Sequence, residues 1–212
     1  MVELKTNCYK GTRITIGNEK RAYLNKCVSY LIDNGFTEID IPIIQYQELF
    51  KDKVGPENGN MMFNFQDAGE RDICLAPEYT AIVQRLAKQV YKYKKDLKLF
   101  YIQECFRGEK PQAGRYRQFT QLGVEILNPS KDYSELLRSI AKSLVIKAVT
   151  PAESGWYSEV FFKNLEENTS AKRGLDYYTN GTGFELAHNL LGGQKQICGG
   201  GPYDVCIVTG KH

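Results

Sequence analysis

The stretch FRGEKPQAGRYRQFTQLGVEI, residues 106–126, joins a basic loop to a strand with two unlike faces. Alternate side chains of a β-strand share a face, so the residues after 118 divide into two sets. The sets are Phe119, Gln121, Gly123 and Glu125 on one face, and Thr120, Leu122, Val124 and Ile126 on the other. The second face is apolar and is expected to pack on the protein. The first is typical of a small-molecule cleft, with an aromatic platform, two polar side chains and a gap left by glycine. A half-exposed strand with a solvated polar face explains the same alternation equally well.

Three arginines surround the loop that precedes this strand. Arg107 ends another predicted strand, where parity places it on the same face as Tyr101, and Arg115 and Arg117 lie on the other limb of the loop. A guanidinium is a permanently charged planar fork that suits phosphate. A single arginine is usually a solvated surface group. Three beside a polar strand face favour anion binding.

The rest of the chain alternates between helical and strand patterns. Helices are predicted over residues 18–34, 79–94, 134–149 and 186–193, strands over 36–44, 72–77, 97–106 and 118–127, hairpins over 51–70 and around Asn180-Gly181, and two strands joined by a glycine-rich turn over 196–208. Helices set apart from antiparallel strands indicate an α+β fold, an antiparallel sheet flanked by helices. We expect a single domain over residues 1–212.

Composition restricts the class of protein. The 212 residues are 42% hydrophobic and 25% charged, which is typical of a globular domain, and the net charge of +3 is weak evidence for a nucleic-acid partner. Six cysteines without a CxxC pair and only two histidines argue against a zinc cluster and against Ser-His or Cys-His catalysis. No apolar run is long enough to span a membrane and no signal peptide is evident, which predicts a cytoplasmic protein. The basic run KQVYKYKK, residues 88–95, either complements a helix dipole or contacts nucleic acid.

Five segments together resemble one family. Residues 106–126 resemble motif 2 of class II aminoacyl-tRNA synthetases, in the form found in histidyl-tRNA synthetases. RGLDYYTNGTGFE resembles the histidine-specific signature of those enzymes, and GFTEIDIPIIQYQELFK resembles motif 1, with Pro42 at its characteristic proline. LAPEYTA and GGGPYD resemble two further family segments, and all five occur in family order between about residues 10 and 206.

The resemblance implies a role for each site residue. Arg107 and Arg173 would be catalytic, contacting the α-phosphate of ATP. ATP would also contact Glu109, Arg115 and Phe119, with the Phe119 ring stacked on adenine. Histidine would be bound by six residues: Glu78, Thr80, Gln121, Glu125, Tyr177 and Tyr178. Gln112 and Arg115 would face the tRNA acceptor end. ATP and Mg2+ are implied as substrate and cofactor, no protein ligand set for a metal is implied, and the region around Pro42 would form a homodimer.

The chain also departs from the family pattern. It stops at His212, where motif 3 should follow, and lacks an anticodon-binding domain, so we expect a class II core truncated at its C-terminus. Only 48 residues separate Glu125 from Arg173, too few for the usual insertion domain. Pro202 replaces an arginine, and Ala76 and Tyr79 replace an arginine and a glycine of the family segments.

Three functions remain open from the sequence. The first is a minimal histidyl-tRNA synthetase-like enzyme that forms histidyl-adenylate for transfer to tRNA. The second is a non-catalytic histidine-binding regulator resembling the regulatory subunit of ATP phosphoribosyltransferase. The third is a truncated paralogue that binds a synthetase or tRNA without chemistry.

Overall fold

A computed structural model describes residues 3–4, 8–15, 17–51, 61–111, 115–149, 165–172, 178–189 and 195–203. The helices are α1 (Asn18–Asp33), α2 (Glu48–Lys51), α4 (Thr80–Gln89) and α5 (Ser134–Val149), with a 3-10 turn at Thr179–Gly181. The strands are β1 (Glu3–Leu4), β2 (Ile14–Thr15), β3 (Thr37–Glu38), β4 (Ile44–Tyr46), β5 (Asn64–Gln66), β6 (Asp72–Leu75), β7 (Leu97–Phe106), β8 (Gln118–Leu127), β9 (Leu165–Lys172), β10 (Thr182–His188) and β11 (Gln196–Gly200). In these parts of the chain no helix is both long and apolar enough to cross a membrane.

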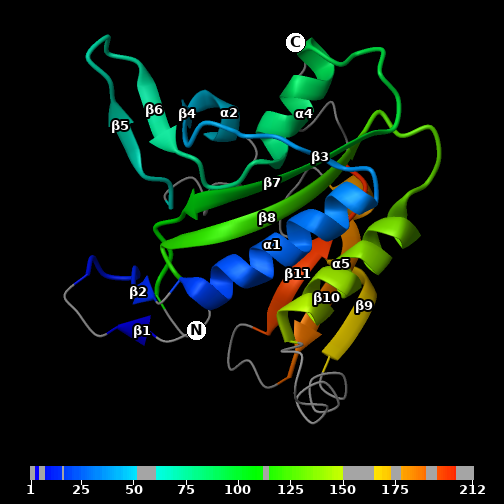
Figure 1. Ribbon diagram of the computed structural model, residues 1–212. Coiled ribbons are helices and arrows are strands. Elements are labelled where there is room, and N and C mark those ends of the chain that lie inside the picture. Colours follow the sequence, from blue (N-terminus) through cyan, green and yellow to red (C-terminus); the bar gives the residue numbers. More distant parts are fainter. Residues whose placement is uncertain are drawn as a thin grey trace.

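The long antiparallel pair of β7 and β8 lies at the centre of the fold (Figure 1). Its register runs without a break from Leu97 opposite Leu127 to Phe106 opposite Gln118. The short β3 pairs in parallel with the other edge of β7, so the sheet order is β3-β7-β8. Both long strands were predicted from their patterns, and the mixed α+β architecture is confirmed.

Helices cover parts of both faces of this hairpin, whereas its alternating sequence predicted packing on the apolar face alone. On one face α4 packs over Tyr101, Cys105 and Leu99 through Val83 and Ala87. On the other face the apolar side chains of β8 meet α1 and α5, in a cluster that includes Cys27, Leu31, Phe36, Phe100, Ile140 and Leu144. Figure 1 shows α4 on one side of the hairpin and α1 with α5 on the opposite side.

Two smaller sheets complete the described structure. One has the order β4-β6-β5, and its β5–β6 hairpin turns at Asp67, whose carboxylate accepts hydrogen bonds from the amides of Gly69 and Arg71. The other has the order β11-β10-β9, and α5 packs against β11. A separate two-stranded arm, β1 with β2, precedes α1.

Several predicted elements have different limits in the structure. The helix predicted over 79–94 spans only Thr80–Gln89, and the strand predicted over 36–44 is reduced to Thr37–Glu38, since Pro42 cannot donate to a ladder. The helix predicted from residue 186 is wrong where it is described, because β10 continues to His188. Strand β9 was not predicted, because its sequence LEENTSAK lacks an apolar alternation. The second strand expected after the glycine-rich turn lies outside the described residues.

Candidate functional site

The polar face of β7 and β8 opens into a cavity of about 1850 Å³. Its lining includes Glu78 and Thr80 at the start of α4, Glu125 on β8, and Arg107 at the end of β7. A cavity of this size exceeds the ~300–1,000 Å³ of an ordinary small-molecule pocket. It therefore has room for a ligand larger than those that ordinary small-molecule pockets hold.

Glu78 is a buried carboxylate at the start of α4. Its two oxygens accept hydrogen bonds from the backbone amides of Thr80 (2.7 Å) and Ala81 (3.3 Å), which are first-turn donors that the helix itself cannot satisfy. Burial raises the pKa of the Glu78 carboxyl, although these amides and the charge of Arg107 oppose the rise. Glu78 therefore fixes the start of the helix at the same time as it faces the cavity.

Glu125 is a second buried carboxylate, only 4% exposed. The Thr80 hydroxyl donates to its Oε1 (3.1 Å) and the Gln84 amide donates to its Oε2 (3.4 Å). Burial raises the pKa of Glu125 to about 8, and the nearby charge of Glu78 contributes to the rise. Two buried carboxylates this close together favour a cationic ligand, because a positive charge between them relieves both the desolvation and the repulsion.

Tyr101 fills the space that sequence reasoning assigned to a ligand. The strand register places it opposite Gly123, and a Cβ atom at that glycine would overlap the Tyr101 ring. The Tyr101 hydroxyl accepts a hydrogen bond from the Gln121 amide (3.2 Å), and the Cys105 thiol donates to the Gln121 carbonyl oxygen (2.9 Å). The predicted gap at Gly123 is thus wrong: the glycine is required by a buried ring, and Gln121 is held by that ring.

We call Glu78, Thr80, Gln84, Glu125 and Tyr101 together the acid end of the cleft. Sequence reasoning missed Gln84 and Tyr101. Tyr101 could have been found because a glycine within β8 indicates that a large side chain of the neighbouring strand lies over it. Gln84 could have been found because it follows Thr80 by one helical turn and therefore shares its face of the helix.

Arg107 and Phe119 lie at the opposite end of the same strand face. The guanidinium carbon of Arg107 is 5.2 Å from the centroid of the Phe119 ring, and its Nε donates to the carbonyl of Pro77 (2.8 Å). This carbonyl holds the fork in place, and the side chain remains 36% exposed. A base stacked on Phe119 would therefore lie beside a fixed positive charge.

Glu109 lies between two arginines in this part of the cleft. Its carboxylate is 4.0 Å from Arg107 Nη1 and 3.7 Å from Arg115 Nε. All three side chains line the cavity, so Arg107, Glu109 and Arg115 lie together in this part of it. We call Arg107, Glu109, Arg115 and Phe119 the arginine end of the cleft.

Arg117 does not join the arginine end. It donates to the Glu109 carbonyl (3.1 Å) and to the Tyr9 hydroxyl (2.8 Å), and its amide donates to the Gly11 carbonyl (2.7 Å). Its guanidinium also lies over the Tyr9 ring. The sequence-based inference that three arginines surround one anion is therefore wrong for Arg117, which ties the N-terminal arm to the loop.

The remaining predicted residues divide between described and undescribed parts of the chain. Tyr178 is buried, lines the cavity, and has its ring centroid 4.9 Å from that of Tyr203. Arg173, Tyr177 and Gln112 lie outside the described residues. Within the described ranges, no group of three histidine, cysteine or acidic side chains is arranged to hold a metal ion.

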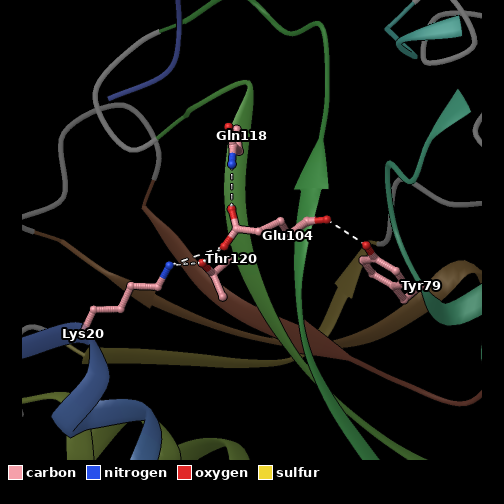
Figure 2. Close-up of polar contacts among 5 residues, drawn as sticks. All are labelled: Lys20, Tyr79, Glu104, Gln118 and Thr120. Atoms are coloured by element: carbon pink, nitrogen blue, oxygen red, sulfur yellow. Dashed lines mark hydrogen bonds and ion pairs between the residues drawn. The ribbon is translucent and has the colours of Figure 1, made fainter. Parts of the chain in front are cut away.

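A polar cluster on the other face of the hairpin fixes α1 to the central strands. Figure 2 shows Lys20 of α1 reaching Glu104 of β7 and Thr120 of β8, while Gln118 donates to the same carboxylate (3.3 Å). Burial alone would raise the pKa of Glu104, but the hydrogen bond from Thr120 and the charge of Lys20 outweigh it and lower that pKa. The Tyr79 hydroxyl donates to the Glu104 carbonyl (2.7 Å), so the tyrosine that replaces a glycine of the resembled segment serves as a packing anchor.

The family model and the relatives that match this chain agree on one family. The family model described as Histidyl-tRNA synthetase matches residues 18–150. The histidine–tRNA ligase of Methanosarcina acetivorans is 28% identical over 98% of this chain and 71% of that protein, and that of Clostridioides difficile is 30% identical over 80% of this chain and 60% of that protein. The ligase of Methanococcus vannielii is 38% identical, over 59% of this chain and 31% of its own length. The chain thus spans between about a third and three quarters of these relatives.

Solved structures agree on the fold. The apo histidyl-tRNA synthetase of Staphylococcus aureus matches with a TM-score of 0.64 and 23% identity, over 96% of this chain and 64% of that chain. A pyrrolysyl-tRNA synthetase from Desulfitobacterium hafniense matches at 0.62 and 17% identity, over 88% of this chain and 58% of its own. A Bacillus halodurans protein described as an ATP phosphoribosyltransferase regulatory subunit/histidyl-tRNA synthetase matches at 0.57 and 17% identity, over 74% of this chain and 48% of its own.

Proposed function

Because this chain belongs to the histidyl-tRNA synthetase family, with the catalytic-core fold of the class II enzymes, we propose that it binds histidine and ATP and activates histidine as histidyl-adenylate. One observation carries the proposal. Two buried carboxylates, Glu78 before α4 and Glu125 on β8, and the half-exposed Arg107 line one cavity, with Glu125 and Arg107 towards opposite ends of the β7–β8 face. Histidine brings cationic groups and ATP brings phosphates, so each end suits one substrate.

The spacing of the two ends fits an adenylate. Phe119 and Glu125 are six residues apart on β8, which is about 20 Å at the usual rise of a strand. Histidine at the acid end and adenine on Phe119 would leave the α-phosphate between them, within reach of Arg107. Mg2+ would enter with the triphosphate as part of the substrate.

Adenylate formation requires the two substrates to be held in line and the phosphate charge to be stabilised, but it requires no general base. The histidine carboxylate attacks the α-phosphorus, a carboxyl-oxygen-to-phosphorus bond forms, and the bond to pyrophosphate breaks. The carboxylate is already ionised, so no proton has to be removed. Arg107 would stabilise the charge on the α-phosphate without losing its own proton, and the rigid acid end would hold the nucleophile in line.

The acid end also supports selectivity for histidine. Glu125, with hydrogen bonds from Thr80 and Gln84, is a fixed acceptor that a protonated imidazole or ammonium group satisfies. A buried acceptor left unpaired discriminates against an apolar amino acid more strongly than a loss of contact area does. Tyr177, Tyr178 and Arg173 complete this proposal as the remaining histidine and phosphate contacts.

Pyrophosphate exchange tests the activation step. Purified protein should exchange labelled pyrophosphate into ATP only when histidine is present. Arg107→Ala should lower the exchange rate by about 10²–10³-fold, since a transition-state charge contact is lost. Arg71→Ala is the matched control, because Arg71 is an exposed arginine paired with Asp67 in the β5–β6 turn. Exchange that ignores histidine, or that survives Arg107→Ala, would contradict the proposal.

A non-catalytic histidine binder is the second candidate, and Glu109 favours it. Its carboxylate partly neutralises both Arg107 and Arg115, so the arginine end has less net charge for a triphosphate than its arginines alone suggest. The Bacillus halodurans neighbour, whose description names a regulatory subunit beside a synthetase, supports keeping this candidate. Histidine binding in calorimetry without any pyrophosphate exchange would support this candidate.

Transfer to tRNA and dimerisation belong to the same proposal. Arg115 and Gln112 would contact the tRNA acceptor end in the cytoplasm. Ile44 and Tyr46 of β4 are 56% and 50% exposed on one face of an edge strand close to Pro42. Apolar side chains at an unpaired edge suit an isologous contact with a second copy. Ile44→Ser should convert a dimer to monomer in sedimentation equilibrium, whereas a protein that is already monomeric would contradict this contact.

A further inference from the structure

The N-terminal arm holds the loop between β7 and β8 at three points. The arm is the β1–β2 pair with the segment before β2, which the structure describes at residues 3–4 and 8–15. In Figure 1 it lies at the end of the hairpin where β7 leads into β8. We call the contacts between the arm and the return limb of this loop, residues 116 and 117, the arm clasp.

Two arginine–tyrosine pairs form the outer parts of the arm clasp, and they run in opposite directions. Arg117 of the loop donates from Nη1 to the Tyr9 hydroxyl of the arm (2.8 Å), and its guanidinium carbon is 5.4 Å from the Tyr9 ring centroid. Arg13 of the arm donates to the Tyr116 hydroxyl of the loop (2.7 Å), and its guanidinium carbon is 3.9 Å from that ring centroid. Each segment supplies one cation and one ring, so both pairs require the same placement of the arm on the loop.

Gly11 forms the central part of the arm clasp. Its carbonyl accepts a hydrogen bond from the Arg117 amide (2.7 Å), and its φ of +86° lies in the left-handed region that favours glycine. A Cβ atom at Gly11 would lie 2.8 Å from Cγ of Arg117 and 2.9 Å from Cγ of Pro111. Pro111 belongs to the outgoing limb of the loop, so the arm reaches both limbs at a position that has no room for a side chain.

Burial of apolar side chains contributes little to the position of the arm. Tyr9 and Ile14 are 59% and 48% exposed. The Tyr9 ring meets the Phe63 ring edge-on, with 6.3 Å between the centroids, and the Gly108 amide at the start of the loop donates to the Met61 carbonyl (2.6 Å). The loop is therefore held from two sides, and on the side of the arm mainly by the polar contacts of the arm clasp.

Arg117 connects the arm clasp to the arginine end of the cleft. The guanidinium that reaches Tyr9 also donates from Nε to the Glu109 carbonyl (3.1 Å). The carboxylate of the same Glu109 lies 4.0 Å from Arg107 Nη1 and 3.7 Å from Arg115 Nε. Glu109 and these two arginines line the cavity, whereas Arg117 does not. An effect of Arg117 on a ligand in the cavity would therefore pass through Glu109.

We propose that Arg117 is a positioning residue for the nucleotide, and that the N-terminal arm sets the ATP affinity of the arginine end through it. By holding the Glu109 backbone, Arg117 fixes the carboxylate between Arg107 and Arg115, and both guanidinium groups are then in place before ATP binds. Charges that are already in place cost less to order on binding than charges on a loose loop. The proposal rests on the proposed function, because it takes ATP as the ligand of the arginine end.

Direct binding titrations of ATP and of histidine to the same protein test the arm clasp. Arg117→Lys keeps the positive charge but loses the planar fork that reaches Glu109 and Tyr9 together, so ATP should bind at least about tenfold more weakly. Tyr9→Phe keeps the ring and removes only the hydroxyl, so the loss should be about three- to tenfold. Histidine affinity should change less than about twofold in both variants, which a partly unfolded protein would not show.

Gly11→Ala disrupts the arm clasp without changing any side-chain donor or acceptor. Its Cβ atom would overlap Arg117 and Pro111, so ATP binding should weaken as it does in Arg117→Lys, again without a matching loss for histidine. Gly17→Ala is the matched control, because its φ is −84° and a Cβ atom there meets nothing within 4 Å, so both affinities should stay unchanged. If Gly11→Ala does not fold, Arg117→Lys and Tyr9→Phe still decide.

A double-mutant cycle tests the route through Glu109. In a Glu109→Gln background the side chain no longer carries the charge that holds the two arginines, so Arg117→Lys should weaken ATP binding by less than about threefold. Equal effects of Arg117→Lys in the two backgrounds, or an ATP affinity that Arg117→Lys and Tyr9→Phe leave unchanged, would overturn the proposal while the proposed function stands. A wild type that binds histidine but no ATP would be a different failure, since it would contradict the proposed function and the nucleotide role of the arm together.

Discussion

The buried carboxylate of Glu125 makes a quantitative prediction about stability. Its pKa is raised from 4.5 to about 8 by burial, so the folded protein binds this proton more tightly than the unfolded chain. The stability that this group contributes is fully present below the unfolded pKa of about 4.5 and is lost as the pH rises through about 8. The full shift corresponds to on the order of 5 kcal/mol.

Glu125→Gln removes this titration and keeps the shape of the side chain. Its amide oxygen can still accept the Thr80 hydrogen bond, and Gln84 can reverse its own amide to match the new donor. We therefore expect wild type and variant to have similar stability at about pH 5, and the variant to be more stable by several kcal/mol at about pH 9.

Urea denaturation across this pH range measures the difference in the free energy of unfolding. Glu38→Gln is the matched control, because Glu38 is exposed on β3. A difference between wild type and Glu125→Gln that stays constant with pH, or a wild type more stable at pH of about 9, would refute the reasoning.

Three further predictions concern the same cleft. Gly123→Ala should lower the free energy of unfolding in urea by about 1–3 kcal/mol, because its Cβ atom would overlap the Tyr101 ring. Gly17→Ala is the control and should be near neutral, since a Cβ atom there meets nothing within 4 Å, and equal effects of the two substitutions would contradict the prediction. Histidine binding near neutral pH should release a proton from the acid end, which calorimetry in buffers of different ionisation enthalpy would detect. Glu125→Gln should abolish this release, and a binding enthalpy of the wild type that does not depend on the buffer would contradict the prediction. Phe119→Ala should weaken ATP by about 1–3 kcal/mol in a direct binding titration and leave histidine affinity unchanged, and a loss of histidine affinity would argue against separate ends.

The alternating sequence of β8 was enough to predict the strand, its two faces and the packing of the apolar face, but not which helices cover them. A period-two pattern follows from the backbone geometry of a strand and from which of its faces is buried, so it can be read from the sequence without knowing any distant contact. Parity placed Phe119 and Glu125 on one face of β8, and the register, which sets odd-numbered residues of the two strands opposite one another, adds Arg107 to that face.

Other features depended on contacts between distant parts of the chain. Arg117 turns away from the cleft because Tyr9 and Gly11 of the N-terminal arm bind it, a contact across more than a hundred residues. Tyr101 occupies the space over Gly123 because of the exact register of two strands. Neither pairing leaves a periodic signal. Strand β9 was missed because its polar sequence forms a strand only when β10 supplies the partner.

The central claim is that one cleft binds histidine at the acid end and the nucleotide at the arginine end. The most direct measurement is the affinity of histidyl-sulfamoyl adenosine, a non-hydrolysable adenylate analogue that reaches both ends at once. We predict binding at least about 100-fold tighter than that of histidine or AMP alone. Glu125→Gln and Arg107→Ala should each weaken the analogue, and Arg107→Ala should change the affinity for histidine itself far less than the affinity for the analogue. An analogue that binds no more tightly than its separate halves, or that responds to only one of the two variants, would contradict the account.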